Sequence, residues 1–408
     1  MEVMPSSRLA NGQNLPAGWH VKKLTDLSDI DAGLSKPKII FGQGFLVVTV
    51  QDLYAGETID ISNLKRVVLT DEEAQRYRLF AGDILIGNAS VKRSGIGYSN
   101  RFDGSKEPVI FAKYAYRVNN LRSISSQYLH YVLRLNQTRQ WIISNSQTGT
   151  LTNLNKAAAK SIPIPFPESE LEQQEICTAL SEIDALLDSL DRLIAKKRDL
   201  KQAAMQQLLT GQIRLPEFSG DWEVKCLGDL AEIVMGQSPS SVNYNSQGFG
   251  LPLIQGNADV VDRHTIRRFF TTQITKKGRT GDTLMSVRAP VGEVSRAMFD
   301  VCLGRGVCAI RFPNEWLYHF LIFIEPTWAK HSKGSTFDSV NSTDIKAVEV
   351  RLPVDQNEQI AIAKVLNEMD WELAAMQHRR DKTAALKQGM MQELLTGRIR
   401  LVPLKEAA

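Results

Sequence analysis

The sequence has few cysteines, and their spacing is not typical of a metal or redox site. Cys177, Cys226, Cys302 and Cys308 contain no CxxC pair, so neither a structural zinc nor a disulfide framework is expected. Long apolar runs are also missing, because no stretch approaches the roughly 20 apolar residues that a membrane helix needs. Residues 1–19 lack the apolar core of a secretory signal. We therefore expect a cytoplasmic protein that makes no membrane contact.

Known catalytic motifs are absent as well. There is no GxxxxGK[ST] phosphate loop, no complete dinucleotide-binding glycine motif, and no N-P-P-[YF] or D-P-P-[YF] tetrapeptide of amino-methyltransferases. Residues 221–225 loosely resemble the E-x-K end of a nuclease site, but their counterpart at 18–22 has no acidic residue, which favours a surface strand. The six histidines are isolated from any nucleophile motif. The sequence predicts no enzyme activity, no cofactor and no metal in this chain.

A long internal repeat is the main feature that the sequence does contain. QQLLTGQIRL at 206–215 returns as QELLTGRIRL at 392–401, 186 positions later, and 20 of the 45 residues in 171–215 are identical to those in 357–401. A weaker repeat precedes each copy, with openings at Trp19 and Trp222 and G-D-x-L motifs at Gly82 and Gly281. Repetition at a fixed offset indicates a duplicated structural unit. The unit is a globular part followed by a long helix.

Both repeated segments have the apolar spacing of a coiled coil, alternating between four and three residues. Each helix is expected to end at the glycine of its LLTG, Gly211 or Gly397, and about 40 residues give a rod of roughly 60 Å. Two rods of matched register favour an antiparallel pair, with the globular parts related by a pseudo-twofold axis. The predicted seam consists of Ile176, Leu180, Ile183, Leu187, Leu190 and Ile194 in the first helix and Ile362, Leu366, Met369, Leu373 and Met376 in the second.

The remaining sequence predicts an α+β fold with two mixed α/β domains. Short β-branched segments separated by Gly, Asn and Asp indicate strands, and a helix is expected over 126–139. The boundaries that we predict are a polar tail at 1–14, a first domain at 15–167, a central helix at 168–215, a second domain at 216–353, a C-terminal helix at 354–402 and a tail at 403–408. Residues 15–165 are basic, with 19 Lys and Arg against 12 Asp and Glu, whereas 216–352 has 15 of each. A basic first domain suits a polyanion such as DNA.

The whole pattern resembles the specificity subunit of Type I restriction-modification systems. The matching features are the Trp openings, the G-D-x-L motifs, the segments GTLTNLNKAAAKSIPIPFP and GSTFDSVNSTDIKAVEVRLP, the E-Q helix starts and the LLTG-x-I-R-L ends. The resemblance implies a non-catalytic subunit with two target-recognition domains, each reading half of an interrupted site in double-stranded DNA. It also implies docking of two methyltransferase subunits and, in the full complex, of restriction subunits. Those partners would bind S-adenosylmethionine, ATP and Mg, and would methylate an adenine that leaves the base stack.

Polar loops after each G-D-x-L strand and before each final strand are the candidate DNA contacts, because in that family such loops face DNA. An ordinary solvated loop residue is the alternative at every position. Arg214 and Arg400, near the helix ends, are expected to anchor each helix to the following domain. The candidates are Lys92, Arg93, Arg101, Gln147, Thr150, Arg288, Lys333 and Thr336, with Arg263, Arg267 and Arg268 as further phosphate contacts.

Two other functions remain open from the sequence. A fused methyltransferase-nuclease would require motifs that this chain lacks. A coiled-coil adaptor, or a DNA-binding regulator that works without methyltransferase subunits, would keep the repeat but not the partners.

Overall fold

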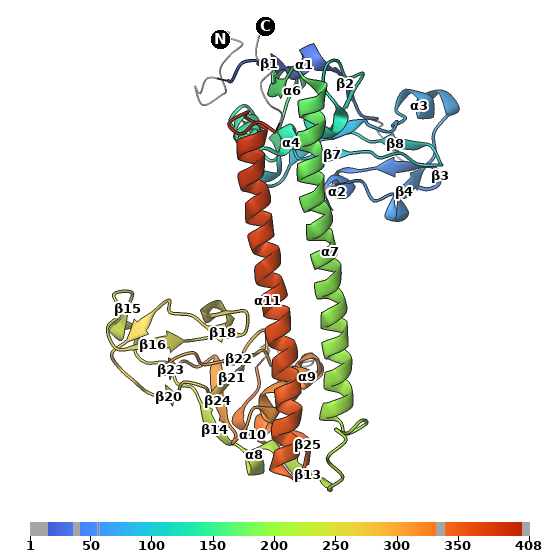
Figure 1. Ribbon diagram of the computed structural model, residues 1–408. Coiled ribbons are helices and arrows are strands. Elements are labelled where there is room, and N and C mark those ends of the chain that lie inside the picture. The colour runs from blue at the N-terminus through green and yellow to red at the C-terminus, as the bar shows by residue number, and fades with distance from the viewer. Residues whose placement is uncertain (1–14, 36–40, 55, 57, 332–338, 402–408) are drawn as a thin grey trace. The chain divides into compact units, whose positions relative to one another are not determined.

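The computed structural model describes residues 15–35, 41–54, 56, 58–331 and 339–401. The chain divides into two units, Met1–Ser189 with Arg379–Ala408 (unit 1) and Leu190–His378 (unit 2). Two long helices, α7 (Glu170–Leu209) and α11 (Gln356–Leu394), contribute to both units (Figure 1). None of the helices in the described residues is long and apolar enough to cross a membrane.

Unit 1 has a four-stranded antiparallel sheet and a three-stranded sheet. The first has the order β2 (Asp29–Ala32), β9 (Ala115–Asn119), β5 (Ile84–Gly87), β7 (Ser99–Arg101), and the second β4 (Lys65–Val67), β3 (Phe41–Val48), β8 (Val109–Phe111). Strand β1 (Trp19–Lys23) pairs with β12 (Pro163–Pro167) and so joins the start of the domain to its end. The smaller elements are β6 (Ala89–Ser90), β10 (Gln147–Thr148), β11 (Thr152–Asn153), α1 (Leu24–Leu27), α2 (Val50–Leu53), α3 (Asp71–Arg76), α4 (Ser126–Arg134), α5 (Asn136–Ser144), α6 (Lys156–Lys160), η1 (Ile61–Asn63) and η2 (Arg93–Gly95).

Unit 2 repeats this plan with more short strands. Its six-stranded sheet runs β14 (Glu232–Met235), β24 (Val307–Arg311), β21 (Thr283–Ser286), β22 (Val294–Arg296), β18 (His264–Thr265), β17 (Val260–Val261). A five-stranded sheet runs β15 (Tyr244–Asn245), β19 (Phe270–Thr271), β16 (Leu251–Ile254), β23 (Val301–Leu303), β20 (Lys277–Gly278), and β13 (Trp222–Cys226) pairs with β25 (Glu349–Pro353). The remaining elements are α8 (Leu227–Leu230), α9 (Trp316–His331), α10 (Ser342–Lys346), η3 (Ser241–Asn243) and η4 (Asn257–Asp259).

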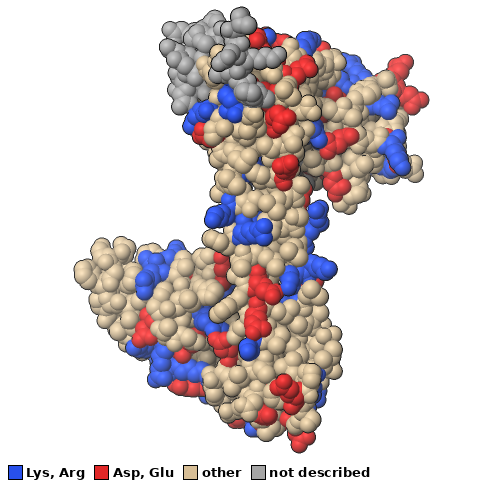
Figure 2. Space-filling view, in the orientation of Figure 1, with Lys and Arg blue, Asp and Glu red and all other residues tan. Residues whose placement is uncertain are grey.

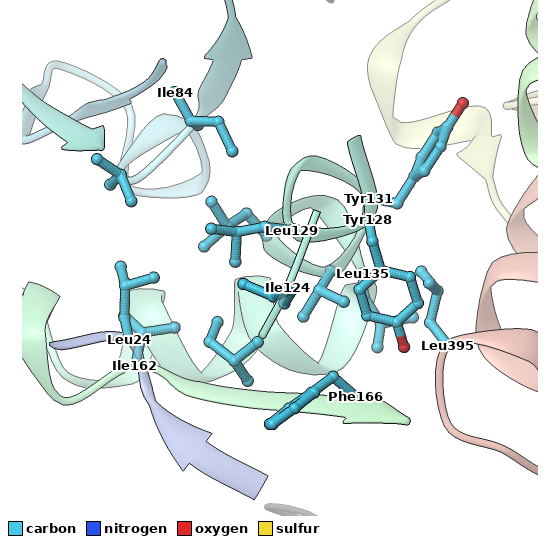
Figure 3. Packing of buried hydrophobic residues seen from close by; sticks show 14 of the residues in the cluster. Leu24, Ile84, Ile124, Tyr128, Leu129, Tyr131, Leu135, Ile162, Phe166 and Leu395 are labelled. Atoms are coloured by element: carbon cyan, nitrogen blue, oxygen red, sulfur yellow. The ribbon is translucent and has the colours of Figure 1, made fainter. Parts of the chain in front are cut away.

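The long helices join the hydrophobic core of each unit. In unit 1 the start of α7, at Ile176 and Leu180, and the end of α11, at Leu394, belong to one buried cluster with residues of α4 and β12. Leu395, just beyond α11, lies in this cluster with Tyr128 and Phe166 (Figure 3). In unit 2 the start of α11 and the end of α7 join the core in the same way. Burial of apolar surface is the dominant stabilising term in folding, so each long helix is fixed to a globular part at both of its ends.

Within each unit, α7 and α11 run antiparallel. In unit 2, Lys197 pairs with Glu372 and Lys201 with Asp370, so the residue number falls along α11 as it rises along α7. In unit 1, Asp184 pairs with Lys387 at 2.5 Å and Glu172 pairs with Arg400 just beyond α11, so the residue number again falls along α11 as it rises along α7. The expected α+β fold with two long antiparallel helices and an internal repeat is confirmed. Of the predicted seam residues, Ile176, Leu180, Leu190, Ile194, Ile362, Leu366 and Leu373 are buried, while Ile183, Leu187, Met369 and Met376 are half-buried.

The repeated motifs at the helix starts and helix ends contact each other. Arg400, beyond the end of α11, forms a two-pronged ion pair with the fully buried Glu172 at the start of α7. Arg214, beyond the end of α7, binds Glu358 at the start of α11 in the same way, with distances of 2.8 Å and 2.5 Å. Arg214 also donates to Gly220 O in the segment that follows it, whereas Arg400 donates to Ala17 O, just before β1. The expected anchoring to the following domain is therefore present for Arg214 only, whereas Arg400 contacts the segment before β1. The main partner of each arginine is the other long helix.

Of two further predictions about helices, the C-terminal glycine caps are confirmed and the single helix over 126–139 is not. Gly211 and Gly397 have φ of +71° and +73°, the left-handed conformation that glycine adopts most easily, so the predicted C-terminal caps are confirmed. The single helix expected over 126–139 is wrong. Leu135 is buried and has an extended ψ of 134°, which ends α4 and starts α5 in a new direction.

Candidate nucleic-acid interface

In unit 1, the small sheet β10-β11-β6 gathers most of the candidate residues. The loop after β5 forms β6, which pairs with β11, so that Ala89 faces Asn153 and Ser90 faces Thr152. Lys92 and Arg93 follow β6 at the start of η2, and Gln147 and Thr150 belong to the β10–β11 hairpin; all four are exposed. The sheet therefore places four side chains that are far apart in the sequence on one group of loops.

Arg101 does not belong to this group. It pairs with Ile84 at the beginning of β5, whereas the candidate loop follows the end of that strand at Gly87. Its guanidinium also pairs with Asp103 at 2.7 Å. Arg101 is therefore placed at the opposite end of the strand from the other candidates of unit 1.

The same arrangement of loops occurs in unit 2. In unit 1 the backbone N–H of Leu154 donates to Asn88 O at 2.9 Å, and in unit 2 that of Val340 donates to Val287 O at 3.1 Å. Arg288, in the loop after β21, forms an isolated bridge with Ser339. Asn155 and Asn341 then cap α6 and α10 with their side chains, which fixes the end of each loop. Lys333 and Thr336 lie outside the described residues.

The remaining arginine candidates of unit 2 already have protein partners. Arg263 pairs with Glu325 at 2.8 Å, and Arg268 pairs with the buried Asp259 at 3.4 Å. The guanidinium of Arg267 lies 4.5 Å from the ring centre of Phe299, a favourable cation–π contact. A phosphate at these positions would compete with internal interactions.

Sequence reasoning missed one exposed turn in each unit. Lys113 and Tyr114 lie between β8 and β9, and Arg305 lies between β23 and β24. The backbone N–H of Asn88 donates to Tyr114 O, and that of Val287 donates to Gly306 O, both at 2.8 Å. Both turns therefore lie against the candidate loop of their unit. In unit 2 the Gly-Arg-Gly sequence around Arg305 is a turn signal that could have identified it.

Charge on the surface does not by itself mark a DNA-binding face. On the face drawn in Figure 2, Lys and Arg side chains are mixed with Asp and Glu side chains over both units. Among the described residues no group of three or more His, Cys, Asp or Glu side chains could hold a metal. The segment with the E-x-K spacing is an exposed strand, β13, in which Lys225 pairs with Glu223 at 2.5 Å.

Comparisons with known proteins agree with this architecture. The family model of the Type I restriction modification DNA specificity domain matches residues 16–196 and 219–383. A putative type I restriction enzyme MjaX specificity subunit of Methanocaldococcus jannaschii is 29% identical over 411 residues, covering 95% of each chain. The MjaIX specificity subunit of the same organism is 24% identical, covering 83% of this chain and 84% of the relative.

Two solved structures show the same fold. One is a chain from work on complex assembly and conformational transition of the type I R-M system, with a TM-score of 0.59 and 23% identity over 95% of this chain and 100% of that chain. The other is the type I restriction-modification S subunit from M. genitalium, with a TM-score of 0.59 and 16% identity over 96% of this chain and 99% of that chain. Because the family model covers most of its length in two matches, this chain belongs to the type I restriction-modification DNA specificity family.

Proposed function

We propose that each unit reads one half of an interrupted, asymmetric site in double-stranded DNA. The observation that carries the proposal is the repeated set of loops, which has the same backbone contacts in both units but different side chains. Unit 1 has Lys92, Arg93 and Lys113 at these loops, and unit 2 has Arg288 and Arg305. Loops with the same backbone contacts but different side-chain donors and acceptors suit two half-sites of different sequence.

The long helices would set the unread gap between the half-sites. Helices α7 and α11 contain 40 and 39 residues, and a rise of 1.5 Å per residue gives about 60 Å for each. The ion pairs between Arg400 and Glu172 and between Arg214 and Glu358 tie the start of each helix to the end of the other. Helices of this set length would favour one gap length over its neighbours.

Catalysis would come from partner subunits. Two methyltransferase subunits would dock on this chain, bind S-adenosylmethionine and methylate adenine at N6, and a restriction subunit with ATP and Mg would cleave unmodified DNA. The described loops offer donors and acceptors for binding, and the chain lacks the sequence motifs of these reactions. In this role the chain supplies sequence recognition and a scaffold.

Methylome sequencing tests the proposal. A methylation-deficient host would carry this chain together with its neighbouring methyltransferase subunit. We expect a bipartite N6-methyladenine motif with a fixed gap, which disappears when this chain is omitted. A soluble complex of the two proteins that produces no new motif would instead favour an adaptor or a DNA-binding regulator.

A further inference from the structure

Unit 2 contains a small polar pocket at the loop end of its six-stranded sheet. Its volume is about 150 Å³, below the 300–1,000 Å³ typical of pockets for whole small ligands. Four loops contribute to it, and the polar side chains in its lining are Ser238, Gln255, Asn257, Ser286, Arg288 and Arg305. A pocket of this size suits the edge of a larger molecule rather than a free cofactor.

Close backbone contacts hold the loops of this pocket in place. A Cβ atom at Gly306 would lie 2.0 Å from the carbonyl oxygen of Gln255, so only glycine allows the two loops to approach this closely. The N–H of Gly304 donates to Ile254 O at 2.7 Å, and the buried hydroxyl of Ser286 donates to Arg288 O at 2.8 Å. The arginine and amide side chains therefore project from a fixed backbone.

The polar ends of four of these side chains are available to a ligand. Within the described part of the chain, the guanidinium groups of Arg288 and Arg305 and the side-chain amides of Gln255 and Asn257 have no hydrogen-bond or ion-pair partner. This distinguishes the two arginines from Arg268, which pairs with Asp259. The residues that line the pocket include no carboxylate, so it combines guanidinium donors with amide groups that both donate and accept.

We propose that this pocket reads the major-groove edge of one G·C base pair in the half-site of unit 2. The inference rests on the proposed DNA-reading function. Guanine presents two acceptors in the major groove, O6 and N7, and its cytosine presents one donor, N4. The fork of Arg288 or Arg305 matches the two acceptors, and the amide oxygen of Asn257 or Gln255 matches the donor. A phosphate is also rich in acceptors, but it offers nothing to an amide oxygen.

Unit 1 has different chemistry at the equivalent place. Where unit 2 has Arg305, the turn before β9 in unit 1 carries Lys113. Its Nζ lies 4.8 Å from the ring centre of Tyr114. The loop after β3 corresponds to the loop of unit 2 that carries Gln255 and Asn257. In unit 1 this loop leads directly into α2, and the N–H of its capping residue Thr49 donates to the Asp52 carboxylate at 2.7 Å. The G·C pair is therefore assigned to one half of the bipartite site.

Conservative substitutions test this assignment in the full chain with its methyltransferase subunit. Arg288→Lys and Arg305→Lys keep the charge but remove the planar fork, and Asn257→Ala removes the amide. Arg279→Lys is the matched control, because Arg279 is exposed in the same unit but precedes β21, at the other end of that strand. Binding would be measured against duplexes carrying each single base-pair change in the methylome-defined site, at two salt concentrations.

We expect discrimination at one G·C pair in one half-site to fall by about tenfold to a hundredfold in Arg288→Lys or Arg305→Lys. Recognition of the other half-site stays unchanged, which shows that the variant folds and assembles, and Arg279→Lys behaves as the wild type. Equal weakening on every sequence, together with a smaller salt dependence in Arg305→Ala, would show phosphate contact and overturn the inference. A half-site of unit 2 with no G·C pair would also overturn it. If the wild-type complex has no bipartite site at all, the proposed function itself fails.

Discussion

Loss of Arg400 should destabilise unit 1 strongly, because it leaves a buried carboxylate without its partner. Glu172 is fully buried, and both of its carboxylate oxygens accept hydrogen bonds from the Arg400 guanidinium. Removing one partner of a buried ion pair costs about 3–5 kcal/mol. In a unit of this size, each kcal/mol lowers the Tm by about 2–4 °C, so Arg400→Ala should lower it by about 6–20 °C.

A nearby exposed pair provides the control. Arg398 binds Glu393 at 3.0 Å, with side chains 41% and 37% exposed, and such pairs contribute about 0–1 kcal/mol. Thermal and urea unfolding of Arg400→Ala and Arg398→Ala would be compared with the wild type. The double variant Glu172→Met with Arg400→Met should recover part of the loss, because it removes both charges together. A loss in Arg400→Ala no larger than that in Arg398→Ala would refute the reasoning.

Three further predictions concern other parts of the fold. His319 is fully buried and burial lowers its pKa below 6.5, so the wild type should lose stability as the pH falls below about 6.5. The loss of unfolding free energy between pH 7 and pH 5.5 should be smaller in His319→Gln than in the wild type, and an equal loss in both would contradict this. A Cβ at Gly33 would lie 2.1 Å from Ala112 O, so Gly33→Ala should lower the free energy of unfolding by about 1–3 kcal/mol in urea. A neutral result would show that the segments that follow β2 and β8 can separate locally. Burial raises the pKa of Cys308 to about 12, whereas Cys226 is exposed. A thiol reagent should therefore modify Cys226 quickly and Cys308 only after unfolding; rapid labelling of Cys308 in the native protein, detected by mass mapping, would contradict this.

The candidate loops show why sequence reasoning found only some of the loops that meet at this end of each unit. Polar loops between β-branched runs are visible in the sequence, and the family resemblance marked the segments around Lys92, Gln147 and Arg288 as candidates. The segments around Arg305 and Asn257 were not identified, because an exposed polar residue in a turn looks the same whether or not other loops surround it. They line one pocket because β16 and β23 pair side by side and bring their following loops together.

The sequence by itself determined the duplicated plan, the two long helices and the glycine caps, because each depends on local spacing and repetition. Tertiary structure decided which repeated residues meet. The E-Q starts and the LLTG-x-I-R-L ends looked like separate motifs, yet Glu172 and Arg400, 228 positions apart, form one ion pair. An ion pair between distant residues leaves no periodicity in the sequence. It exists only because the antiparallel packing of α7 and α11 within unit 1 brings the start of one helix to the end of the other.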